Sequence, residues 1–111
     1  MLNVSENGYI SLTRGDTARL TVSVTDDVSG EPYELQNGDT LTLSVKKSIK
    51  DVDPVLSKTI ENTDTFHIEP KDTAGLSFGK YMYDVQLTMS DGDVYTIIPP
   101  STFEILTEVT S

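Results

Sequence analysis

The most constraining feature of the chain is a long alternating segment at residues 80–90. A period of two turns one set of side chains toward a core and the other toward water, as in a half-buried β-strand. Just upstream, the pattern Leu76-x-x-Gly79-x-Tyr81 is typical of β-sandwich domains where the chain passes between sheets. We expect Gly79 to permit the bend and the Tyr81 hydroxyl to bond back to the preceding turn. The inward set predicted for this strand is Tyr81, Tyr83, Val85, Leu87 and Met89.

The rest of the chain repeats this pattern in shorter segments separated by turn residues. Asp91-Gly92 is a hairpin signal, and residues 70–76 predict one helical turn. Pro99-Pro100 is expected to break a ladder, because proline has no N–H to donate. About eight or nine short strands with regular turns predict an all-β sandwich or small barrel. The other predicted strands span residues 9–13, 18–25, 40–47, 55–60, 65–68, 94–98 and 103–106, with a brief extended piece at 33–35.

Length and charge limit the classes of protein that fit. The 111 residues suit one domain, 1–111, with 1–8 and 107–111 as flexible tails. There is no cysteine, so disulfides and thiolate zinc sites are excluded. A net charge of −10 repels phosphate backbones and anionic lipids, which argues against nucleic acid and membrane partners. We find no long apolar run for membrane insertion and no secretory signal peptide at the start, so we expect synthesis in a cytoplasm.

Two motifs could suggest chemistry, and both have ordinary structural explanations. Arg14-Gly15-Asp16 has the composition of an integrin-binding tripeptide, but these are common turn residues and we interpret them as a turn. His67, the only histidine, would be the base of any Ser-His-Asp triad. It lies between two residues predicted to face inward, Phe66 and Ile68, so we expect it to project into solvent. The sequence therefore predicts no catalytic residue and no enzyme.

Acidic pairs leave a calcium site as an open alternative. No segment matches the twelve-residue helix–loop–helix calcium motif, and Asp91 and Asp93 are better explained as hairpin residues. The chain has no tryptophan on which a sugar could stack, and we expect its strand tyrosines to pack in or beside the core. Phosphate-binding glycine loops are absent, so we predict no cofactor-binding and no metal-binding residue. The acidic pairs are Asp26/Asp27, Asp51/Asp53 and Asp91/Asp93, and the strand tyrosines are Tyr81, Tyr83 and Tyr95.

Three segments together resemble one known family. They are ISLTRGDTARLTVSV at residues 10–24, LQNGDTLTLSVKK at 35–47, and GKYMYDVQLTMSDGDVYTIIPPSTFEI at 79–105. In this order they resemble the immunoglobulin-like N-terminal domain of the phage baseplate upper protein and related prophage tail-associated proteins. The resembled protein continues into a long stalk-forming region beyond this domain. The chain departs from antibody domains in lacking the cysteine pair and core tryptophan.

The resemblance implies an immunoglobulin-like antiparallel β-sandwich of about 7–9 strands. It implies a non-enzymatic structural protein of the virion, a tail or baseplate component that docks on other phage structural proteins and assembles as a homo-oligomer. We expect strand edges to be the docking surfaces, and the weaker strands at 55–60 and 103–106 to be those edges. The alternative is a bacterial surface module that binds a cell-surface glycan or calcium. A hydrolase is a third reading that no set of residues supports.

Overall fold

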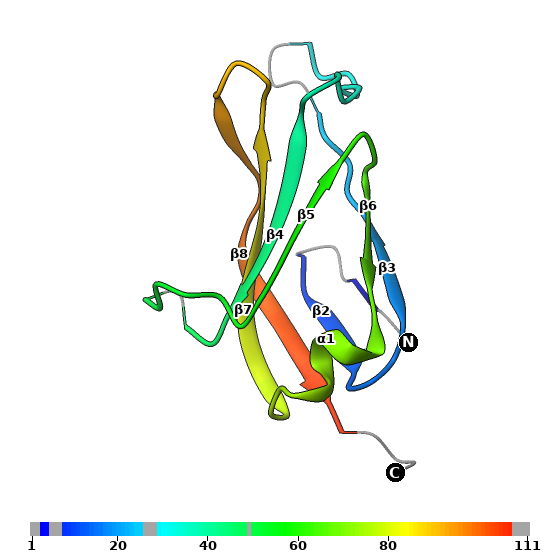
Figure 1. The fold of residues 1–111 in the computed structure, drawn as a ribbon, viewed down its shortest axis with the longest axis vertical. Coiled ribbons are helices and arrows are strands. Elements are labelled where there is room, and N and C mark those ends of the chain that lie inside the picture. Colours follow the sequence, from blue (N-terminus) through cyan, green and yellow to red (C-terminus); the bar gives the residue numbers. More distant parts are fainter. Residues whose placement is uncertain (1–2, 5–7, 26–28, 49, 108–111) are drawn as a thin grey trace.

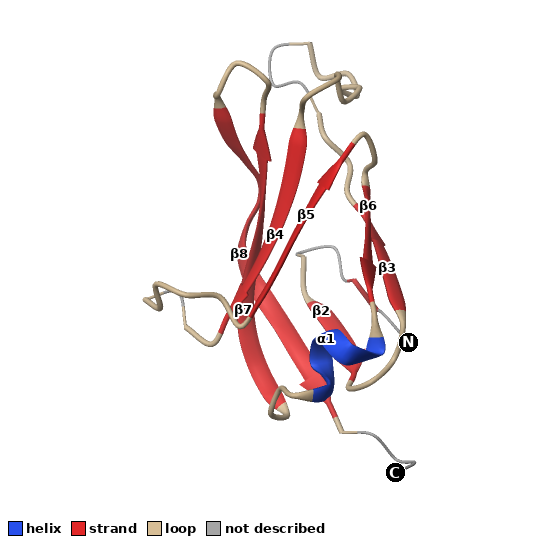
Figure 2. Cartoon of the chain, in the orientation of Figure 1, coloured by secondary structure: helices blue, strands red, loops and turns tan. Residues whose placement is uncertain are grey.

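The computed structural model describes residues 3–4, 8–25, 29–48 and 50–107, and these are almost entirely strands and turns (Figures 1 and 2). The all-β class predicted from the alternation is confirmed. One short helix begins at Pro70, where the sequence predicted a helical turn. The elements are β1 (Asn3–Val4), β2 (Ile10–Thr13), β3 (Ala18–Thr21), β4 (Thr40–Lys46), β5 (Leu56–Glu61), β6 (Thr65–Ile68), α1 (Pro70–Ala74), β7 (Gly79–Thr88) and β8 (Val94–Leu106).

The strands form two sheets. The larger has the order β1-β2-β8-β7-β4-β5, and the smaller pairs β3 with β6. Figure 1 shows β3 and β6 side by side on one flank, with β7, β8 and β4 on the other. The prediction of a purely antiparallel arrangement is wrong, because β2 runs parallel to β8 from the Ile10–Phe103 pair to the Thr13–Leu106 pair. Parallel neighbours need a crossover connection, and here nearly the whole chain forms it.

Both sheets contribute to one hydrophobic core. On β7 the predicted alternation is confirmed, and Met89 beyond its end is partly buried against the same core. The rings of Tyr83 and Phe103 meet edge to face, with centroids 6.0 Å apart. Burial of apolar side chains from both sheets holds the sheets together. The buried apolar residues are Ile10, Leu12, Ala18, Leu20, Val22, Val24, Leu41, Leu43, Val45, Phe66, Ile68, Tyr81, Tyr83, Val85, Leu87, Phe103 and Ile105.

The corner between α1 and β7 has the predicted geometry. Gly79 has φ 131°, a backbone region that favours glycine. The Tyr81 hydroxyl donates to the Ser77 carbonyl at 2.9 Å, so the ring of a core residue also fixes the turn before its strand. The hairpin at Asp91-Gly92 is likewise confirmed, with the Gly92 N–H bonded to the Met89 carbonyl at 2.9 Å.

The edges of the large sheet differ in part from the prediction. β5 is an edge strand, as expected. Residues 103–106 are not an edge, because β2 pairs with them on one side and β7 on the other. Pro99 and Pro100 have no partners in the register, which passes from Val85–Ile98 to Tyr83–Ser101. The ladder is therefore interrupted as predicted, although β8 continues through the prolines as a bulged strand.

One smaller prediction is corrected. Asn3–Val4, placed in a flexible tail, pair with β2 as strand β1. The brief extended piece predicted at residues 33–35 follows an isolated bridge between Thr25 and Pro32, and the Tyr33 N–H donates to the Val24 carbonyl at 2.8 Å.

Candidate functional site

The Arg14-Gly15-Asp16 segment is a turn whose residues are engaged within the domain. The Gly15 N–H donates to the Thr73 hydroxyl at 2.9 Å, and the Asp16 N–H to the Thr13 carbonyl at 3.1 Å. The Arg14 guanidinium lies 4.2 Å from the centre of the Phe78 ring, a cation–π contact. This turn therefore joins the β2–β3 connection to α1 and the segment after it, and the prediction of a turn is confirmed.

The remaining predicted chemical residues are scattered over the molecule. His67 is exposed on the outer face of β6, opposite Arg19 of β3. The Asp51 carboxylate accepts the Ser48 N–H at 3.1 Å, and the Asp91 carboxylate accepts the Asp93 N–H at 3.0 Å, so each bonds its own turn. Asp26 and Asp27 lie outside the described residues. Within the described part of the chain, no three His, Cys, Asp or Glu side chains come together as a metal site.

The three strand tyrosines differ in how deeply they are buried. Tyr81 and Tyr83 are core residues, as predicted. Tyr95 keeps 49 % of its surface exposed. The prediction placed Tyr95 in or beside the core, but about half of its side chain is exposed to solvent.

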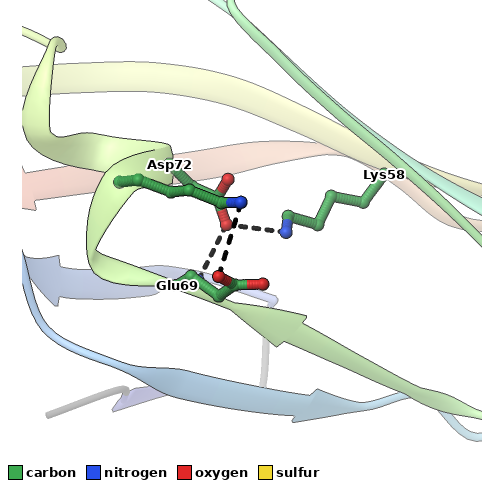
Figure 3. Close-up of polar contacts among 4 residues, drawn as sticks. Lys58, Glu69 and Asp72 are labelled. Atoms are coloured by element: carbon green, nitrogen blue, oxygen red, sulfur yellow. Dashed lines mark hydrogen bonds and ion pairs between the residues drawn. The ribbon is translucent and has the colours of Figure 1, made fainter.

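An ion pair fixes α1 to the edge strand β5 (Figure 3). Lys58 Nζ lies 2.7 Å from Asp72 Oδ2, and the same carboxylate oxygen accepts the Glu69 N–H at 2.7 Å. Partial burial opposes ionisation of Asp72, but the hydrogen bonds from Lys58 and from Glu69 outweigh it and lower the pKa of the carboxyl. Lys58 lies opposite Leu43 on the inner face of the sheet, so an edge strand carries an inward-pointing charge. Such charges are a known protection of strand edges against unwanted pairing.

A buried carboxylate organises the opposite end of the molecule. Asp39 is only 2 % exposed, and its Oδ2 accepts the Tyr33 hydroxyl at 2.6 Å and the Gln36 N–H at 2.8 Å. Its Oδ1 accepts the Ser90 N–H at 3.3 Å, from the turn between β7 and β8. The Tyr33 hydrogen bond is the main reason that the pKa of Asp39 is lowered, and it raises the pKa of Tyr33 to about 12. This cluster ties the loop before β4 to the β7–β8 hairpin.

The surface also has an open hollow of about 610 Å³ beside the segment that follows β3. Glu34 and Asp64 contribute its two carboxylates. The rest of the described wall comes from residues between strands, mainly with small or apolar side chains, so the hollow offers surface for contact. Its lining comprises residues 22–25, 32–35 and 62–64.

A free, uncharged strand edge is the clearest candidate for a functional surface. Residues 94–103 of β8 contain no charged side chain, in a chain with a net charge of −10. In the described part of the chain, residues 94–98 pair with β7 on one side only. Val94 is 54 % exposed, and Ile97 and Ile98 are partly buried against the core. Apolar edges without charges are templates for another strand.

A scan against protein-family models found no match, and a search of curated proteins found no similar sequence. Among the described residues, no helix has the length and apolar character needed to cross a membrane.

Proposed function

We propose that this chain is a non-enzymatic structural protein of a phage or prophage virion, a tail or baseplate component that docks on other phage structural proteins. The observation that carries the docking part of the proposal is the free, uncharged edge of β8 at residues 94–98. The assignment to a virion rests on the sequence resemblance described above. On this proposal, the protein is made in the host cytoplasm and acts in the assembled phage particle.

We also propose that the fold is an immunoglobulin-like sandwich. The order β8-β7-β4-β5 matches the G-F-C-C′ sheet of that fold, and the β3-β6 pair matches its strands B and E. Tyr81 stands near the start of β7 and bonds upstream to Ser77, as the tyrosine of the E–F corner does. Tyr83, two residues later, takes the buried position where antibody domains carry a cysteine, and its ring contacts Phe103.

Docking would proceed by strand addition. A partner strand bonds to the open N–H and C=O groups of the edge, and alternate side chains set the specificity. The acidic surface elsewhere opposes non-specific association, because like-charged copies repel one another. A pairing surface confined to one edge then gives a defined orientation in an assembly.

Mass spectrometry of purified particles tests the virion assignment. Particles from a strain that carries the gene should contain the chain in amounts comparable to the other tail proteins, and an antibody to it should label the tail. Presence of the chain only in the soluble lysate, and not in particles, would overturn the proposal.

The alternative of a glycan- or calcium-binding module is favoured by one observation, the hollow with its two carboxylates. A ligand that binds only the folded chain raises the melting temperature by mass action. A clear rise with calcium chloride or with one member of a glycan panel would support this alternative, and unchanged melting across the panel would exclude it for those ligands.

A further inference from the structure

We infer that the partner of the β8 edge is a second copy of this chain, paired antiparallel about a twofold axis through Tyr95. The inference deepens the proposed docking function and rests on it for the choice of docking surface. It follows from the backbone directions, side-chain exposure and charges of residues 93–98.

The backbone hydrogen bonds of β8 show which of its N–H and C=O groups point away from β7. The Met89 N–H donates to the Asp93 carbonyl at 2.8 Å, so Asp93 directs its polar groups toward β7. Directions alternate along an antiparallel ladder, and the pairs Val94–Thr88, Tyr95–Leu87 and Thr96–Gln86 follow without interruption. Val94 and Thr96 therefore direct their N–H and C=O groups away from β7, toward the free edge.

A twofold axis through Tyr95 satisfies all of these open groups. It places Val94 opposite Thr96 of the second copy, and Thr96 opposite Val94 of the second copy, so each chain donates two hydrogen bonds and accepts two. Tyr95 then faces Tyr95 of the second copy as a non-hydrogen-bonded pair, in which side chains approach most closely. Its 49 % exposure leaves the ring available for that contact.

Charge favours this edge over that of β5 for contact between two acidic copies. In this register Asp93 lies opposite Ile97 of the second copy, so the two Asp93 residues are four residue steps apart. That separation is about 13 Å at strand spacing, beyond the screening length of about 8 Å at physiological salt. A twofold pairing through the middle of β5 would instead bring two Lys58 side chains together. The last residue of that strand, Glu61, is also charged.

The pairing covers few residues, so we expect weak self-association. Small interfaces are typical of transient contacts, and dissociation constants of about 10–1,000 μM would correspond to such an interface. In an assembly the copies are held near one another, and a weak pairing of this kind becomes populated.

Single cysteines provide a direct test, because the chain has none of its own. Facing residues in a non-hydrogen-bonded pair have Cα atoms about 4.5 Å apart, within disulfide range. Under mild oxidation, Tyr95→Cys should form a covalent dimer about tenfold faster than two controls, because proximity raises the effective concentration. The controls are Val94→Cys, which does not face itself in this register, and Ser57→Cys on the exposed face of edge strand β5.

Sedimentation equilibrium supplies the second measurement. Tyr95→Lys should weaken self-association at least about tenfold, since two like charges would meet on the axis, whereas Ser57→Lys should leave it unchanged. Thermal melting of both variants establishes that they remain folded. Equal cross-linking at the three cysteine positions, or a monomer at about millimolar concentration, would overturn the inference.

The outcomes separate this inference from the proposed function. If the chain is monomeric but Tyr95→Lys abolishes its incorporation into particles, the edge binds a different protein and the second-copy inference fails alone. If the chain dimerises through Tyr95 but is absent from particles, the inference holds and the virion assignment fails.

Discussion

The Tyr81 hydroxyl donates to the carbonyl of Ser77, four residues earlier, at 2.9 Å. The ring of Tyr81 is 5 % exposed, so one side chain contributes to the core and fixes the corner that leads out of α1. This corner sets where β7 begins, and β7 lies between β4 and β8 in the middle of the large sheet.

Tyr81→Phe tests the corner. It keeps the ring and removes the hydrogen bond, so we expect the free energy of unfolding to fall by about 1 kcal/mol. The matched control is Tyr95→Phe, which removes a hydroxyl from an exposed ring and should change stability by less than about 0.5 kcal/mol. Urea unfolding of the two variants measures the difference, and equal losses would show that the Ser77 contact contributes nothing.

Gly38 and Gly92 form a second matched pair. Both have positive φ, 94° and 97°, and so an alanine at either position meets backbone strain of about 1–2 kcal/mol. A Cβ at Gly38 would also lie 2.9 Å from the Cβ of Ser90, whereas the space around Gly92 is open. We expect Gly38→Ala to cost about 1–3 kcal/mol more than Gly92→Ala, because the loop must move away from the hairpin. Chemical denaturation checks this, and similar costs for the two variants would contradict the close packing of loop and hairpin.

Lys58→Met tests the protection of the β5 edge. Both partners of the ion pair retain some solvent contact, so its loss should cost no more than about 1 kcal/mol. Self-association should nevertheless increase, because an inward charge is removed from a free edge. Light scattering over a concentration series measures this, with Lys80→Met, at an exposed lysine of the central strand β7, as the control. Unchanged scattering by Lys58→Met would mean that other charges guard the edge.

Local patterns predicted the strands well because alternation needs only neighbouring residues. The inward face of β7, the bend at Gly79 and the solvent position of His67 all follow from a period of two. The same rule, applied to β5, would have placed Lys58 on the inner face with Leu56 and Ile60.

Pairings between distant segments could not be predicted in this way. Residues 103–106 are predicted at an edge as one of the weaker strands, but β2 covers them, from about ninety residues earlier in the chain. The buried state of Asp39 depends on Ser90, 51 residues away. In the sequence, Asp39 is indistinguishable from a turn aspartate, since Asn37-Gly38-Asp39 has ordinary turn composition.

Asp39 gives the domain a predictable response to acid. The hydrogen bonds from Tyr33, Gln36 and Ser90 lower its pKa below the usual 3.8 in the folded chain. Its contribution to stability is therefore complete above the pKa of the unfolded chain and is lost as pH falls through the folded value. We expect Asp39→Asn to be less stable than the parent at pH 7 and to converge with it as the pH falls below the lowered pKa of the folded chain. Thermal melts from pH 2 to 7 measure this, with the exposed Glu31→Gln as the control.

The hydrogen bond between Tyr33 and Asp39 also predicts how the stability of the domain changes at alkaline pH. This hydrogen bond raises the pKa of Tyr33 from 10.0 in the unfolded chain to about 12 in the folded one. A raised pKa gives stability that is complete below pH 10 and is lost as pH rises through the folded value. Ultraviolet titration should show one tyrosine ionising near pH 12 that is missing in Tyr33→Phe, and the variant should also lose part of the acid dependence attributed to Asp39. If Tyr33→Phe keeps both the high-pH titration step and the full acid response, the hydroxyl–carboxylate bond does not link these residues in solution.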